Sequence, residues 1–137
     1  MRKRLLLLGL LLPVILLTAS CASYMYGYTL ADAEDRFILV GNDEDDFGRR
    51  RLGYVMGHSS PIEGFVLTHG YPDMTFESTL QGRAAIALYY VRSEEVYVFM
   101  EQNWQPDSRF LLEHREMSAD ERGIYQQLAG VTLEPSI

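Results

Sequence analysis

The second half of the chain carries the clearest pattern of apolar positions. Residues 84–91 form an unbroken run of apolar residues, which is typical of a central strand buried on both faces. A short turn at 92–94 separates this run from residues 95–101, in which apolar side chains alternate between two faces. One face carries Val96, Val98 and Met100, and the other carries Tyr97 and Phe99. The pattern predicts two neighbouring strands joined by a turn.

A third strand is predicted to follow them. Residues 103–107 contain Asn, Pro and Asp, which is typical of a turn. Residues 108–114 then carry Phe110 and Leu112 at alternate positions. We expect these two side chains to point inward.

The first half of the chain has a less regular pattern. The apolar run 37–40 fits a buried strand, whereas the wider spacing of apolar residues over 29–40 also fits a helix, so we expect a helical turn followed by a strand. The mainly acidic segment 42–46 is interpreted as a solvated hairpin tip, with 51–57 as the returning strand. Residues 74–81 are polar and are expected to be irregular.

Two short helices have marked ends. Ser60 and Glu63 have the spacing of a capping box, with Pro61 at the first helical position. Gly70 and Pro72 predict the end of this helix. Its expected buried face is made of Ile62, Phe65, Val66 and His69.

The second helix begins at another capping box, Ser118 and Glu121, and ends at Gly130. Its expected apolar stripe is Ile124, Tyr125 and Leu128. Together these elements predict an α+β fold, a small antiparallel sheet of three to five strands packed with two or three short helices.

The N-terminus has the order of a secretory signal. Residues 1–4 are basic apart from Met1, residues 5–17 are apolar apart from a glycine and a proline, and residues 18–20 are small. A helix over the apolar run would be about 20 Å long, which is short of a bilayer core of about 30 Å. A cleaved signal is therefore favoured over a permanent spanning helix.

The segment Leu17-Thr18-Ala19-Ser20-Cys21 resembles the lipobox of bacterial lipoproteins. The resemblance implies that Cys21 becomes the first mature residue and carries acyl chains, which would anchor the protein to a membrane. Thr18 departs from the pattern, because leucine is commoner three residues before the cysteine. The alternative is an ordinary signal peptide with an incidental cysteine.

The resemblance also implies a destination and a domain organisation. Ala22 follows the cysteine where an aspartate would favour retention at the inner membrane, so in a Gram-negative cell the expected location is the outer membrane, facing the periplasm. We expect a signal peptide over 1–20, a lipidated tether over 21–28 and a single periplasmic domain over 29–137.

Composition narrows the possible partners. All 19 acidic residues follow residue 20, whereas 3 of the 12 basic residues precede it, so the mature chain has a net charge of about −10. Nucleic acid is an unfavourable partner for such a surface. Cys21 is the only cysteine, which excludes an intrachain disulfide and a zinc site built on several thiolates.

The acidic loop raises the question of a cation site. Counted from Asp43 as the first position of an EF-hand loop, Asp45 and Gly48 fit, but Phe47 and Tyr54 occupy positions that need oxygen ligands. An EF-hand is therefore excluded. A looser cation site that uses Asp43 and Asp45 is an alternative to a solvated loop.

No enzyme signature is found in the sequence. The chain has no G-x-S-x-G, no H-E-x-x-H and no glycine-rich phosphate loop. His58 and His69 flank the first helix and Asp73 follows it, so a periplasmic enzyme or a small-ligand or metal binder that uses these three residues is the alternative function. No cofactor is expected.

Aromatic residues suggest a surface for a partner. Tyrosine and tryptophan are enriched where proteins meet, and Trp104 lies in a polar turn. Trp104 and Tyr71 are therefore the candidate partner-binding residues.

The order of elements from Ser60 to Asp73, a cap, a short helix and Gly-x-Pro-Asp, followed by an apolar meander, resembles small lipoproteins of the outer-membrane β-barrel assembly machinery, of the SmpA/OmlA type. The acidic loop and the C-terminal helix depart from that type. The resemblance implies a non-enzymatic accessory or binding module in envelope assembly or maintenance, with another envelope protein as its partner.

Overall fold

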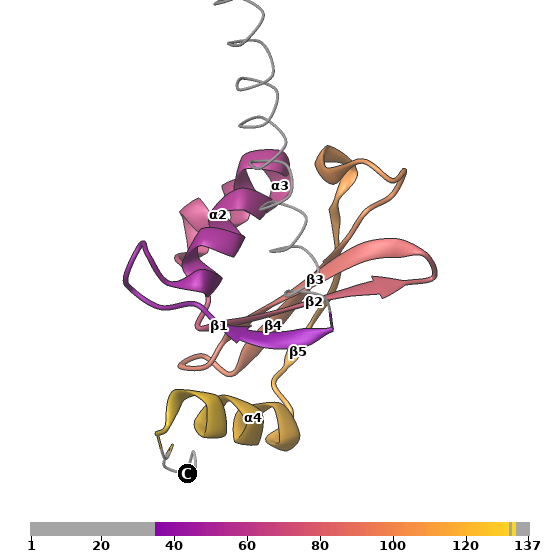
Figure 1. Ribbon diagram of the computed structural model, residues 1–137. Coiled ribbons are helices and arrows are strands. Elements are labelled where there is room, and N and C mark those ends of the chain that lie inside the picture. Colours follow the sequence, from indigo (N-terminus) through magenta and orange to yellow (C-terminus); the bar gives the residue numbers. More distant parts are fainter. Residues whose placement is uncertain (1–34, 132, 134–137) are drawn as a thin grey trace, which may run out of the picture. The chain divides into compact units, whose positions relative to one another are not determined.

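An antiparallel meander of five strands forms the middle layer of the domain (Figure 1). The computed structural model describes residues 35–131 and 133, which belong to one unit of the chain, Ala33–Ile137. The strands lie in the sheet in the order of the sequence. They are β1 (Arg36–Leu39), β2 (Met74–Leu80), β3 (Arg83–Tyr90), β4 (Glu95–Met100) and β5 (Phe110–Glu116).

Helices cover both faces of this sheet (Figure 1). Within the described residues they are α2 (Phe47–His58), α3 (Ser60–His69) and α4 (Ala119–Ala129), and a 3₁₀ helix, η1 (Pro106–Ser108), precedes β5. The α+β prediction is confirmed. The helical turn, the tether and the signal expected before residue 35 lie outside the described residues.

The alternation of side chains along β3 and β4 supplies apolar residues to both faces of the sheet, so a hydrophobic core forms on each face. Ile86 and Leu88 lie on the face covered by α2 and α3, and they pair with Phe99 and Tyr97 of β4. The intervening positions, such as Tyr89 opposite Val96, lie on the face covered by α4. The predicted central strand and the two faces of its partner are confirmed.

Helix α2 replaces the predicted returning strand, which was wrong. Leu52, Val55 and Met56 are buried at helical spacing, and the arginine before them, Arg51, is buried with them. The charged run and three glycines conceal this pattern in the sequence. The mainly acidic segment 42–46 therefore joins β1 to a helix and is not a hairpin tip.

Helix α3 occupies the predicted residues, but its capping box is not formed. The N-cap is Ser59, without a side-chain hydrogen bond. The backbone N–H and the hydroxyl of Ser60 both donate to Asp107, at 3.0 and 3.1 Å. A carboxylate from the β4–β5 connection thus takes the place of the expected cap.

Strand β2 was not predicted, because its alternation is spread over residues of mixed polarity. Met74 and Phe76 face α4, opposite Tyr89 and Ala87 of β3, while Thr75 and Glu77 face the other side. The alternation along β2 becomes recognisable only when its pairing with β3 is known.

Strand β5 was predicted at the right place, but the orientation of its apolar residues was wrong. Phe110 and Leu112 are exposed, because β5 lies at the edge of the sheet and a bulge interrupts its pairing between Val98 and Phe99. An edge strand lacks the second neighbour that buries a central strand.

Helix α4 has the predicted beginning and end. Ser118 and Glu121 form the capping box, and Gly130 ends the helix in the left-handed conformation. Ile124 and Tyr125 pack on the sheet, whereas Leu128 is exposed.

Candidate functional site

The β2–β3 turn and the β4–β5 connection lie at the same end of the sheet (Figure 1), and exposed apolar residues occur in or beside both. Leu80 begins the turn, and the ring of Trp104 lies over Gly82 within it. Phe110 pairs with Met100 at the same end of the sheet. We name the exposed apolar residues at this end the apolar end surface; they are Leu80, Trp104, Phe110, Leu111 and Leu112, of which Phe110 and Leu111 point to opposite faces of the sheet.

The loop that carries Trp104 is fixed by hydrogen bonds. The Ser108 hydroxyl accepts from the backbone N–H groups of Gln102 and Asn103, at 3.0 and 3.1 Å. The same hydroxyl donates to the Gln105 carbonyl at 2.6 Å. The bonds from Ser60 to Asp107 fasten the loop to α3. Trp104 is therefore presented by a constrained loop.

Trp104 is both exposed and conformationally unusual. Its side chain is 70% exposed and its φ is 60°, a left-handed backbone that residues other than glycine rarely adopt. A left-handed backbone costs a non-glycine residue about 1–2 kcal/mol. An exposed indole in such a conformation is consistent with a role in contact with a partner.

Tyr71, the other predicted contact residue, is already partly occupied. The guanidinium carbon of Arg49 lies 3.2 Å from the centre of its ring, which is the geometry of a cation–π contact. Its side chain is 43% exposed. Tyr71 is thus a weaker candidate than Trp104, because a partner would have to displace Arg49.

His58 and His69 take part in helical contacts. In each case Nδ1 lies 2.8–3.0 Å from the carbonyl oxygen four residues earlier, that of Tyr54 or Phe65. His69 also stacks on Phe65, with ring centroids 3.8 Å apart. These contacts satisfy carbonyl groups at the ends of α2 and α3.

Asp73, the third residue of the alternative site, lies elsewhere. Its carboxylate accepts a hydrogen bond from the Val91 N–H at 2.7 Å, which fixes the start of β2 against the end of β3. Among residues 35–131 and 133, no three His, Cys, Asp or Glu side chains are arranged to hold a metal ion. Asp43, in the acidic loop, accepts from the Asp45 N–H at 3.0 Å.

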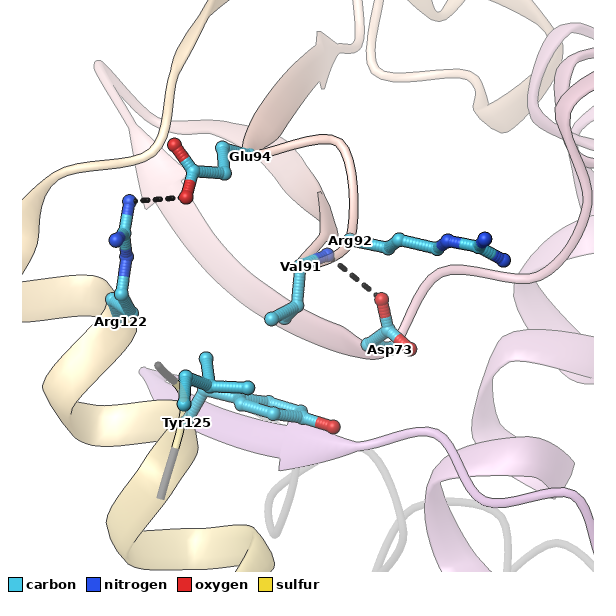
Figure 2. A pocket seen from close by; sticks show the side chains of 7 residues that line it. Asp73, Val91, Arg92, Glu94, Arg122 and Tyr125 are labelled. Carbon is cyan, nitrogen blue, oxygen red and sulfur yellow. Dashed lines mark hydrogen bonds and ion pairs between the residues drawn. The ribbon is translucent and has the colours of Figure 1, made fainter. Parts of the chain in front are cut away.

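A pocket of about 360 Å³ lies beside Asp73, between the β3–β4 turn and α4 (Figure 2). Arg122 of α4 and Glu94 of the turn form an ion pair of 2.7 Å across it. Burial and the nearby Asp73 carboxylate raise the pKa of the Tyr125 hydroxyl. Three charged groups of the pocket are thus already engaged: Glu94 and Arg122 with each other, and Asp73 with the backbone.

Sequence reasoning found Trp104 but missed the apolar side chains beside it. Leu111 and Leu112 are adjacent apolar residues on a strand, so at least one of them points away from any single core. That signal was present in the sequence. Leu80 could not be found in this way, because β2 was not predicted.

The predicted anchor residue, Cys21, lies outside the described residues. Within the described part of the chain, no helix is sufficiently long and apolar to cross a bilayer.

Comparison of the chain with protein-family models, with curated proteins and with solved structures found no match.

Proposed function

We propose that this protein is a lipid-anchored, non-enzymatic binding module of the cell envelope. Acyl chains on Cys21 would hold it at the outer membrane, facing the periplasm, and the apolar end surface would contact another envelope protein. The contact residue at the centre of the proposal is Trp104. An accessory role in envelope assembly or maintenance is part of the same proposal.

The single observation that carries the binding role is the presentation of Trp104. A largely exposed indole on a fixed loop loses little conformational entropy when a partner covers it. Tryptophan is also among the residues that dominate the energy of protein interfaces. The neighbouring Leu80 and Phe110 supply further apolar area.

The anchoring role rests on the lipobox-like sequence around Cys21. Two or more acyl chains anchor a protein stably, whereas one chain gives only marginal binding. The two parts of the proposal are independent, so each has its own experiment.

The binding role is tested by photo-crosslinking in intact cells. A photoreactive phenylalanine analogue is placed at position 104 of the full chain, and at Leu67 in a control. Leu67 is 72% exposed on α3, which makes it a matched apolar position away from the proposed surface. We expect position 104 to capture one envelope protein that position 67 does not capture, and equal capture patterns would contradict the binding role.

The anchoring role is tested with Cys21→Ser in the full chain. We expect the unchanged protein to gain the mass of acyl chains, to incorporate a labelled fatty acid and to sediment with membranes. The variant should lose all three properties. Unchanged mass and membrane partitioning in the variant would overturn the anchor.

A further inference from the structure

The outer edge of β5 is open in the described part of the chain. β5 pairs with β4 on one side, and no described strand pairs with its other side (Figure 1). An open edge presents backbone N–H and carbonyl groups that can pair with another strand. The segments at both ends of β5 leave this edge clear. The connection before it is fastened to α3 through Asp107, and α4 runs back against β1.

The direction of the backbone groups along β5 follows from one hydrogen bond. The Met117 N–H donates to the Glu94 carbonyl at 2.7 Å, so Met117 faces β4. Because backbone groups alternate along a strand, Arg115 and Glu113 also face β4. The backbone N–H and carbonyl groups of His114 and Glu116 therefore point away from β4, towards the open edge of the sheet.

Two β5 edges that are related by a two-fold axis must pair antiparallel. The outward residues of one copy must also lie opposite outward residues of the other copy, so that their backbone groups can form hydrogen bonds. Four registers do so over the regular part of β5, residues 113–116, and the one centred on Glu113 places two glutamates directly opposite each other, which is unfavourable. A register centred on Glu116 brings no opposite charges face to face. A register centred on Arg115 places two arginines directly opposite each other, which is unfavourable.

The remaining register is centred on His114, and it matches charges twice. It places Glu113 opposite Arg115 of the second copy, and the symmetric pair repeats this match. Both side chains lie on the face that carries α4. The Glu113 side chain is 52% exposed, and that of Arg115, which Glu121 holds by two hydrogen bonds, is 34% exposed, so the two meet across the junction as partly exposed opposite charges.

We propose that β5 pairs edge to edge with β5 of a second copy of this chain, antiparallel and centred on His114. The result is a continuous sheet of ten strands, with the two α4 helices on one face. Exposed apolar side chains at the start of β5, Leu111 and Leu112, lie beside the junction and are partly covered by it. This pairing requires neither the lipid anchor nor a contact through Trp104.

Disulfide trapping in the full chain tests the register. In the proposed pairing, His114 lies opposite itself with Cα atoms about 5.5 Å apart, within the range of a disulfide. Two Glu113 side chains are diagonal neighbours, about 7–8 Å apart, which is too far for a disulfide. We expect His114→Cys to give at least about tenfold more disulfide-linked dimer than Glu113→Cys under mild oxidation.

Four controls accompany the trapping. The parent chain reports any dimer that forms through Cys21. Adding Glu113→Arg to His114→Cys places two arginines face to face, and we expect at least about a fivefold loss of dimer. Thermal unfolding of each variant shows that it is folded, and Trp104→Gly should leave the dimer yield unchanged.

Several outcomes would overturn the pairing. They are no dimer above the parent level from His114→Cys, equal yields from positions 113 and 114, and capture of a different protein at 114 in place of a second copy. Loss of partner capture at Trp104 with an intact dimer would contradict only the binding role.

Discussion

Glu121 is the residue on which the largest number of polar contacts converge at the start of α4. Its carboxylate accepts two hydrogen bonds from Arg115, at 2.6 and 2.8 Å. It also accepts from the Ser118 N–H at 2.9 Å and from the Tyr89 hydroxyl at 3.1 Å. One side chain therefore joins α4 to β5 and to β3.

These contacts predict a dependence of stability on pH. The hydrogen bonds from Arg115, followed by those from Ser118, lower the pKa of Glu121 from 4.5 to about 2. Because the pKa is lower in the folded state, the stabilisation is complete above pH 4.5 and is lost as the pH falls towards 2. With allowance for solvent around Arg115, it is about 2 kcal/mol.

Glu121→Gln tests this contribution, with the free energy of unfolding measured by denaturant titration. We expect the variant to be about 2 kcal/mol less stable than the parent at pH 7 and nearly equal to it at pH 2. A difference that is the same at both pH values would show that the charge of Glu121 contributes nothing.

At the residue scale, the sequence predicted what depends on near neighbours in the chain. The Ser118–Glu121 box was predicted because both partners lie within one helical turn. The bonds from Arg115 and Tyr89 to the same carboxylate were not, because those residues come from strands whose positions were unknown. The failure of the box at Ser60 has the same origin, since Asp107 lies 47 residues away.

At the element scale, α2 shows how a helix can be hidden by its composition. Three arginines and three glycines mask an apolar stripe that is nonetheless at helical spacing. One of these glycines, Gly48, has a packing role. A Cβ there would overlap the carbonyl oxygen of Leu39 and approach the side chain of Ile38, so the first turn of α2 rests directly on β1.

Gly48→Ala is therefore expected to lower the free energy of unfolding by about 3 kcal/mol, a cost typical of overpacking. Gly53→Ala in the same helix is the matched control, because a Cβ there meets no atom within 4 Å. The control should raise stability by about 0.5–1 kcal/mol through helix propensity. Thermal or denaturant unfolding of both variants measures the contrast, and equal effects would contradict the close approach.

At the scale of the whole molecule, a buried ion pair joins the helical layer to the sheet. Arg51 of α2 donates two hydrogen bonds to Glu77 of β2, at 2.7 and 2.8 Å, and the side chains are only 8% and 13% exposed. A second pair, Arg109 with Glu101, is similarly buried. Burial lowers the pKa of the Arg109 guanidinium, while Glu101 and Glu77 oppose that shift.

Removing one member of such a pair leaves a buried charge without its partner. We expect Arg51→Met to lower the free energy of unfolding by about 3 kcal/mol. The double variant Arg51→Met with Glu77→Leu should recover most of this loss, because an apolar pair is no less stable in such a site. Additive losses in the double variant, measured by denaturant unfolding, would show that the two residues do not depend on each other.

The candidate site was predictable only in part. Trp104 was identified from the sequence because a tryptophan in a polar turn has no apolar neighbours along the chain. The apolar end surface as a whole joins two hairpin ends, so its extent depends on the register of the sheet. The α+β fold class, by contrast, follows from local patterns, and the meander order places each strand beside its neighbour in the sequence.

The meander also has a consequence for the order of folding. Strands β2 to β5 can pair one hairpin at a time, each closing a short loop, which is fast. β1 joins them only by closing a much longer loop, because α2 and α3 both lie between it and β2 in the chain. We therefore expect β1 to dock last, and its apolar residues to be the segment most exposed to aggregation in a newly made chain.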